Sequence, residues 1–218
     1  MNQNVTERSV EIPVDSAILL GDLVIPGITT ALVIFAHGSG SSRLSPRNRF
    51  VASALQKDAM ATLLFDLLTP EEDRDYDMRF NIELLTQRLE AATLWVAAQP
   101  DLAGFPLGYF GASTGAAAAL GAAADLSERI GAVVSRGGRP DLTPRDLGLV
   151  RAATLLIVGG LDDVVIQLNR QAYSGLTAKK EMQIVQGATH LFEEPGTLEE
   201  VARLASDWFR QHLSGPLR

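Results

Sequence analysis

The stretch GASTG, Gly111–Gly115, decides how this chain folds. An apolar, strand-like run (Pro106–Phe110) precedes it, and an alanine-rich, helical run (Ala116–Ala124) follows it. The small residues around Ser113 permit a strained turn from strand to helix, which leaves the serine hydroxyl exposed at the carboxyl edge of a sheet. The N–H groups at the start of the helix point at the same spot, where an oxyanion would develop. The pattern therefore favours a nucleophilic serine over a chance glycine and serine turn.

Strand-like and helical patterns alternate along most of the chain. Val10–Val14 and Ala17–Ile25 predict two antiparallel strands, and the apolar run Thr30–Ala36 is typical of a strand that is buried on both faces. Further strands of this kind are predicted at Ala61–Phe65, Pro106–Phe110, Gly131–Val134, Thr154–Val158 and Met182–Val185. Helices are predicted at Arg47–Lys57, Phe80–Ala98, Thr114–Ala124, Val165–Leu176 and Thr197–Leu213. The alternation predicts the α/β class: a single domain, residues 1–218, with a mainly parallel, twisted sheet between helices.

Length, charge and composition exclude several classes of function. The 218 residues include 46% apolar residues, enough for a substantial core, and no cysteine, so disulfide and thiolate chemistry are excluded. The net charge of −7 disfavours binding to nucleic acid or to anionic lipid. The first residues lack the pattern of a signal peptide, and no apolar run is long enough to cross a membrane. We therefore expect a cytoplasmic protein with neither nucleic acid nor membrane as a partner.

A serine becomes a nucleophile when a base removes its proton, and the chain offers three histidines for that role. His212 lies near the end of the last helix and is interpreted as a surface residue. His37 follows a buried strand and is favoured as structural. His190 lies in the loop between the last strand and the last helix, which opens at the same sheet edge as Ser113. His190 is therefore the predicted base.

The acid that would orient this imidazole is expected between the serine and the histidine in the chain. The run Leu155–Val165 (LLIVGGLDDVV) contains a buried strand, a glycine turn and two carboxylates, Asp162 and Asp163. The residues alone hardly separate the two, although Asp163 could simply cap the helix that follows.

The order GASTG, GGLDDVV and ATH resembles the α/β-hydrolase superfamily over nearly the whole chain. Within it, the short core resembles the dienelactone hydrolase-like group. The resemblance implies an α/β-hydrolase fold, and its G-x-x-D-x-x-V pattern favours Asp162 as the acid. Dienelactone hydrolases proper use a cysteine nucleophile, whereas this chain has serine. No lid domain is expected, because the interval between Val134 and Ala153 has room only for a loop and a short helical turn.

The segment after the third predicted strand, His37-Gly38-Ser39-Gly40, resembles the oxyanion loop of the superfamily. The resemblance implies that the backbone N–H groups of Ser39 and Thr114 form the oxyanion hole. The glycines and serines also suggest a phosphate-binding loop, but the lysine and the spacing of that motif are missing.

Arginines gather where two predicted strands end. Arg43, Arg47 and Arg49 surround the start of a helix, and Arg136 follows the strand at Gly131–Val134. Surface ion pairs are the simpler interpretation. The alternative hypothesis is that Arg43 and Arg136 bind a substrate carboxylate, because a guanidinium recognises planar anions through two hydrogen bonds. The acidic residues at 71–77 are interpreted as a solvated loop, and no metal site is expected there because no histidine joins them.

The predicted function is a serine hydrolase that cleaves a small ester or lactone through Ser113, His190 and Asp162. Such acyl-enzyme chemistry requires no cofactor. The same residues could cleave a thioester or a peptide. A non-catalytic binding module that keeps the fold is the alternative from another class, since fold does not determine function.

Overall fold

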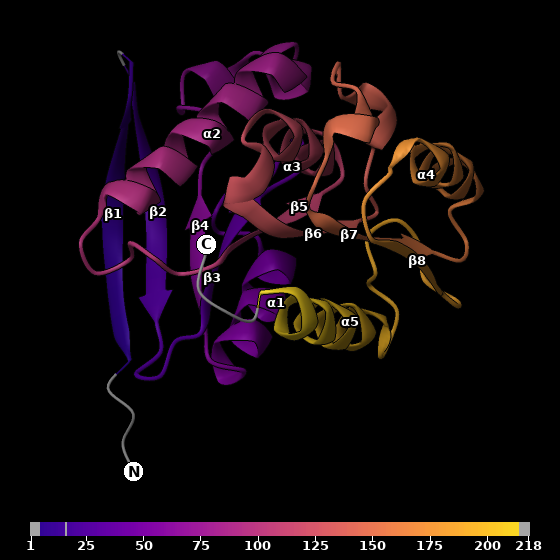
Figure 1. The fold of residues 1–218 in the computed structure, drawn as a ribbon. Helices are drawn as coiled ribbons and strands as arrows, with labels where there is room; N and C mark the ends of the chain where they lie inside the picture. The colour runs from indigo at the N-terminus through magenta and orange to yellow at the C-terminus, as the bar shows by residue number, and fades with distance from the viewer. Residues whose placement is uncertain (1–4, 16, 214–218) are drawn as a thin grey trace.

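A computed structural model describes residues 5–15 and 17–213, which form one eight-stranded sheet in the order β1-β2-β4-β3-β5-β6-β7-β8 (Figure 1). The strands are β1 (Thr6–Val14), β2 (Ala17–Ile25), β3 (Ala31–Ala36), β4 (Met60–Phe65), β5 (Leu107–Ala112), β6 (Ile130–Arg136), β7 (Ala153–Gly159) and β8 (Lys180–Val185). The first two strands are antiparallel, and β3 to β8 run parallel. The predicted fold class and the order of its elements are confirmed.

Helices cover both faces of the sheet (Figure 1). The helices α2 (Ile82–Ala98), α3 (Thr114–Asp125) and α4 (Asp163–Gly175) lie on one face, and α1 (Pro46–Lys57) and α5 (Thr197–His212) lie on the other. The side chains of β3 alternate between the two apolar cores, and all six of its residues are buried. A strand sandwiched in this way must be apolar on both faces, which explains the unbroken hydrophobic run in the sequence.

The register of the parallel strands brings their carboxyl ends to one edge. Ala36 of β3 pairs with Gly111 of β5, and Ala112 of β5 pairs with Arg136 of β6. Gly159 of β7 pairs with Val185 of β8. The loops that follow these strands carry the polar residues singled out above, so they lie at one edge of the sheet.

The loops at this edge contain only short helical turns in the part of the chain that the structure describes. After β4 come η1 (Glu72–Arg74) and η2 (Met78–Phe80); after β6 come η4 (Pro140–Leu142) and η5 (Leu147–Leu149). The remaining turn, η3 (Ser127–Arg129), lies between α3 and β6. Within the described residues, none of the helices has the length and apolar character required to cross a membrane. The first four residues, on which the signal-peptide expectation also depends, lie outside the described residues.

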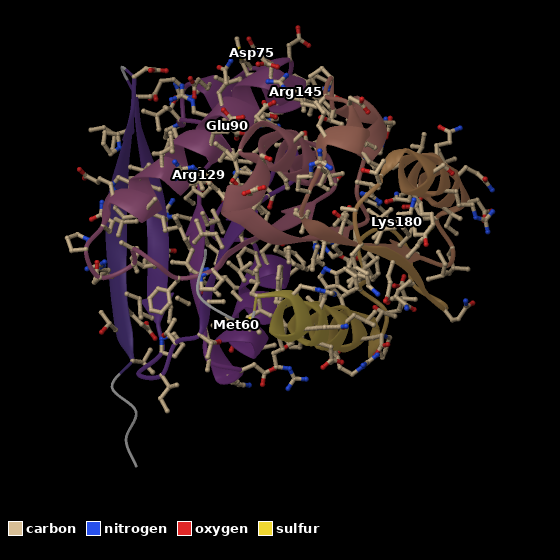
Figure 2. The ribbon with its side chains drawn as sticks, viewed as in Figure 1. Met60, Asp75, Glu90, Arg129, Arg145 and Lys180 are labelled. Carbon is tan, nitrogen blue, oxygen red and sulfur yellow. The ribbon has the colours of Figure 1, made fainter. Side chains whose placement is uncertain are left out.

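A carboxyl group on α2 makes stability depend on pH. Burial, and then the neighbouring Asp125 at the end of α3, raise the pKa of Glu90 to about 7. The negative charge of Glu83 raises the pKa of Glu90 further, and the positive charge of Arg145, which also pairs with Glu83 and Asp125, opposes the shift (Figure 2 labels Glu90 and Arg145). The folded state therefore holds a proton that the unfolded chain releases near its ordinary pKa.

We expect the free energy of unfolding to fall as the pH rises from about 4.5 to 7 and Glu90 becomes charged. Glu90→Gln removes this titration, so the variant should exceed the parent in stability at pH 8 by about 1 kcal/mol, a value reduced because Glu90 is partly exposed to solvent. Urea unfolding of both proteins at pH 4 and pH 8 measures the difference. An equal pH dependence in the two proteins would contradict this assignment.

Candidate active site

Ser113 sits on a strained turn between β5 and α3. Its backbone has φ 51° and ψ −119°, a conformation that costs an L-residue about 1–3 kcal/mol. Neighbouring backbone holds it there: the Ser113 N–H donates to the Arg136 carbonyl at 3.2 Å, and the Arg139 N–H donates to the Ser113 carbonyl at 3.1 Å. The strain is thus balanced by bonds to the adjacent strand end, and the hydroxyl is turned out of the sheet edge.

A glycine next to the serine lets α3 approach the sheet. A Cβ atom on Gly115 would lie 2.2 Å from the carbonyl oxygen of Ala36 and 2.4 Å from that of His37. No real side chain fits at such distances, so only glycine permits this contact between the start of α3 and the end of β3. The buried alanines of α3 continue the close packing along the helix.

Three side chains from separate loops meet above this turn. The Nδ1 atom of His190 lies 2.7 Å from Oδ2 of Asp162, and its Nε2 atom lies 3.3 Å from Oγ of Ser113. Because the carboxylate can only accept, Nδ1 carries the proton and Nε2 accepts from the serine hydroxyl. The arrangement can pass the serine proton to the imidazole.

The two aspartates take different places. Asp162 is the residue before α4, and its carboxylate is turned to His190 instead of capping the helix. Asp163 opens the first turn of α4 with an exposed side chain, where its negative charge complements the helix dipole.

Glycine packing also places the His190 loop. A Cβ atom on Gly159 would lie 2.5 Å from the carbonyl oxygens of Ala188 and Thr189. The Leu161 N–H donates to the Ala188 carbonyl at 2.9 Å. The turn that carries the acid and the loop that carries the histidine are therefore one packed unit.

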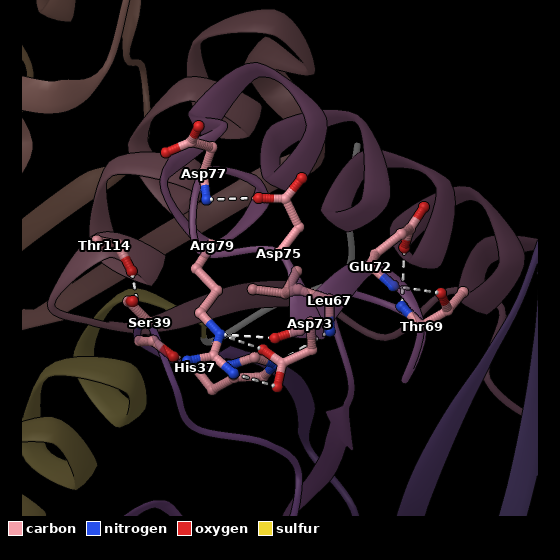
Figure 3. A network of polar contacts seen from close by, with 11 residues as sticks. His37, Ser39, Leu67, Thr69, Glu72, Asp73, Asp75, Asp77, Arg79 and Thr114 are labelled. Atoms are coloured by element: carbon pink, nitrogen blue, oxygen red, sulfur yellow. Dashed lines mark hydrogen bonds and ion pairs between the residues drawn. The ribbon is translucent and has the colours of Figure 1, made fainter.

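The two residues of the expected oxyanion hole lie beside Ser113, but one donor is already engaged. The Ser39 N–H donates to the side-chain Oγ1 of Thr114 at 2.8 Å (Figure 3). A Cβ on Gly38 would lie 3.1 Å from Cβ of Ser113, which brings the Ser39 loop against the serine. The Thr114 N–H belongs to the first turn of α3, whose donors have no acceptor within the helix. No motif in the sequence indicates that the Thr114 hydroxyl would accept this hydrogen bond.

His37 is held by backbone on both ring nitrogens. Its Nδ1 lies 3.0 Å from the Gly38 carbonyl oxygen, and its Nε2 accepts from the Leu67 N–H at 3.0 Å (Figure 3). Burial lowers the pKa of His37, so the ring is neutral at physiological pH. It ties the ends of β3 and β4 together, as the structural interpretation requires.

The two arginines paired in the sequence hypothesis have different surroundings. The guanidinium of Arg43 forms an ion pair with Asp66 and lies 3.7 Å from a carboxylate oxygen of Asp22. Arg136 is buried at the end of β6, and its guanidinium carbon lies 5.7 Å from the ring centre of Phe192. The carboxylates of Asp66 and Asp22 therefore neutralise the charge of Arg43, whereas Arg136 lies next to the loop that carries His190.

The acidic segment after β4, predicted as a solvated loop, is largely exposed, and it also contains short helical turns and paired carboxylates. Asp73 binds Arg79 through both of its carboxylate oxygens, and Glu72 pairs with Arg88 at 2.9 Å (Figure 3 shows Asp73, Arg79 and Glu72). Asp75 accepts from the Asp77 N–H. Among the described residues, no group of three or more His, Cys, Asp or Glu side chains is placed to hold a metal ion.

Comparison with known structures identifies the family. The chain is 54% identical to a dienelactone hydrolase from Anabaena variabilis, with a TM-score of 0.93 over 96% of this chain and 99% of that one. The chain belongs to the dienelactone hydrolase-like group of the α/β-hydrolases. Est1E from Butyrivibrio proteoclasticus is 15% identical, with a TM-score of 0.79 over 93% of this chain and 98% of Est1E, and shows the likeness of fold alone. No protein-family model matches the chain.

Two curated relatives of this dienelactone hydrolase-like chain come from strains of Mycobacterium tuberculosis and carry a provisional name as phosphoribosyl transferases. Each is 57% identical over 210 residues, which cover 96% of this chain and 47% of the relative. The chain thus spans about half the length of the curated relatives it matches.

We expect Gly115→Ala to destabilise this hydrolase fold by about 2–3 kcal/mol, because the new methyl group would collide with the Ala36 carbonyl. Gly175→Ala is the matched control: the end of α4 has ordinary space for a Cβ, so the change should stay within about 1 kcal/mol. Urea unfolding of the three proteins gives both values. Equal stability of Gly115→Ala and the parent would contradict the close-approach argument.

Proposed function

We propose that the chain hydrolyses an ester or lactone of a small molecule through a covalent acyl-enzyme on Ser113. The observation that carries this proposal is the chain of contacts from Asp162 through His190 to Ser113, at 2.7 and 3.3 Å. The strained backbone of Ser113 adds support, because strain of this kind gathers at functional sites.

In the proposed reaction, Nε2 of His190 takes the serine proton while Oγ attacks the carbonyl carbon of the substrate. The tetrahedral intermediate collapses, the bond to the alcohol oxygen breaks, and the imidazolium returns its proton to that oxygen. A water molecule then repeats the sequence on the acyl-enzyme and releases the acid. Asp162 holds the imidazole in one tautomer and stabilises its charged form.

The oxyanion of the intermediate would be bound by the backbone N–H groups of Thr114 and Ser39. The Ser39 N–H must first leave the Thr114 hydroxyl, so a rotation of that side chain accompanies the reaction in our proposal. When the Ser39 N–H exchanges the Thr114 hydroxyl for the oxyanion as its acceptor, its hydrogen bond becomes stronger, because hydrogen bonds to ionised acceptors are shorter and stronger.

The same groups could cleave a thioester or a peptide, since both also pass through a tetrahedral oxyanion. We favour an ester or lactone because this group of the α/β-hydrolases contains a 54% identical dienelactone hydrolase. We assign the transferase in the name of the longer curated relatives to the half of those proteins that this chain does not match.

An activated serine reacts with a fluorophosphonate, whereas an ordinary serine does not. We expect one phosphonyl group per chain, located on Ser113 by mass spectrometry of peptides. Ser113→Ala should abolish both the labelling and the hydrolysis of p-nitrophenyl acetate and keep the parent's circular dichroism spectrum. Turnover at the parent's rate in this variant would refute the proposal, and an unlabelled parent would indicate a binding module.

The neighbouring aspartates give a matched test of the acid. Asp162→Asn should lower kcat by about 10⁴-fold, because an amide stabilises the wrong imidazole tautomer. Asp163→Asn should leave kcat within about threefold, since its side chain is exposed in the first turn of α4 and it is Asp162 that contacts His190. A larger loss of kcat in Asp163→Asn than in Asp162→Asn would contradict the assignment of Asp162 as the acid.

A further inference from the structure

The three residues that follow β6, the 137–139 segment, contact both the proposed nucleophile and the proposed base. A Cβ atom on Gly137 would lie 3.5 Å from Nδ1 of His190, so this residue packs against the imidazole ring. Two residues further on, the Arg139 N–H donates to the Ser113 carbonyl at 3.1 Å. The position of this segment therefore affects both the turn that carries Ser113 and the ring of His190.

The 137–139 segment is also bonded to the strand that leads to the proposed acid. The Gly137 N–H donates to the Ile157 carbonyl of β7 at 2.8 Å, and β7 ends three residues before Asp162. Asp162 precedes α4 directly, and its carbonyl accepts the Ile166 N–H of that helix at 2.9 Å. The segment thus links the parts of the fold that carry all three members of the proposed triad.

One buried side chain joins this segment to α4. Asn169 has an exposed fraction of 0%, and its Nδ2 atom donates to the Gly138 carbonyl at 2.9 Å and to the Val165 carbonyl at 2.8 Å. Val165 lies in the first turn of α4, three residues after Asp162. The two carbonyls fix the orientation of the amide, because only its NH₂ group can donate to both. Asn169 therefore bonds the start of the acid's helix to the 137–139 segment.

Packing alone does not explain an amide at this position. The other buried residues of α4 are apolar: Val165, Ile166 and Ala172. A buried amide costs free energy unless its groups are hydrogen-bonded, and Oδ1 of Asn169 has no partner among the described residues. An apolar side chain of similar volume would avoid this cost but could not donate to the Gly138 carbonyl. What distinguishes Asn169 is therefore the link that it forms.

We propose that Asn169 is a positioning residue for the reaction at Ser113. It holds the start of α4, and with it Asp162, in a fixed place relative to the segment that contacts Ser113 and His190. The inference rests on the proposed function and adds a residue to its machinery. Proton transfer depends on alignment, and a displacement of about 1 Å caused by a distant substitution can cost about 10²-fold in rate.

An apolar replacement of similar volume tests this inference. Asn169→Leu removes both hydrogen bonds and should lower kcat for p-nitrophenyl acetate by about 10- to 100-fold. KM should stay within about twofold, because the alignment of Asp162 with His190 serves proton transfer and not substrate binding. Thr93→Val is the matched control: Thr93 is equally buried, and its hydroxyl bonds that of Tyr109, which joins α2 to β5. This variant should lose stability in urea and keep kcat within about twofold.

A double-mutant cycle separates positioning from a general loss of stability. Because Asn169 acts through Asp162, Asn169→Leu should change the rate by less than about twofold in the Asp162→Asn background, where the acid is already lost. The rate of phosphonylation of Ser113 is the readout for these slow variants. Asn169→Ala is the second variant should the leucine prevent folding. A water molecule can then bind the Gly138 carbonyl, and kcat should fall in the same direction.

Two results would overturn the inference while the proposed function stands, with Ser113 labelled in the parent. One is a folded Asn169→Leu or Asn169→Ala protein whose kcat stays within about twofold of the parent's. The other is an equal loss of rate in the parent and Asp162→Asn backgrounds, which would show that the amide only stabilises the fold. Activity that survives in Ser113→Ala would instead refute the proposed function, and the inference with it.

Discussion

The strained backbone of Ser113 is the constraint on which the rest of the structure depends. A residue held at φ 51° must be fixed by its neighbours, and here the carbonyl of Arg136 and the N–H of Arg139 supply the bonds. The close approach of α3 to β3 at Gly115 completes the support. The hydroxyl is thereby oriented at the sheet edge by the fold itself, so in the proposed reaction the cost of orientation is met during folding.

Charge is distributed unevenly around this edge. After β4, Asp73 binds Arg79 within the loop, and Glu72 binds Arg88 of α2. At the end of β6, the guanidinium of Arg136 is buried near Phe192, in the loop that carries His190. A chain with a net charge of −7 thus buries a positive group next to the loop that carries His190.

The sequence predicted the order and type of the elements because the signals are local: β3 is apolar throughout, and GASTG stands between a strand and a helix. Boundaries differed by a few residues, as in β1, which begins at Thr6 instead of Val10. The rule that parallel strands end at one edge predicted that Ser113 and His190 would lie at the same edge, whereas the choice of Asp162 over Asp163 came from the resemblance to the α/β-hydrolases. The partners of Arg43 and the hydroxyl that engages Ser39 could not be predicted, since both depend on side-chain positions in loops with no periodic pattern.

The central claim is that the start of α3 stabilises an oxyanion formed at Ser113. A crystal structure of the phosphonylated protein tests it most directly, because a phosphonyl oxygen occupies the place of the oxyanion. We expect that oxygen within about 2.7–3.1 Å of the Thr114 and Ser39 nitrogens, with the Thr114 hydroxyl turned away. A phosphonyl oxygen that faces solvent, with the Ser39 N–H still bound to Thr114, would contradict the claim.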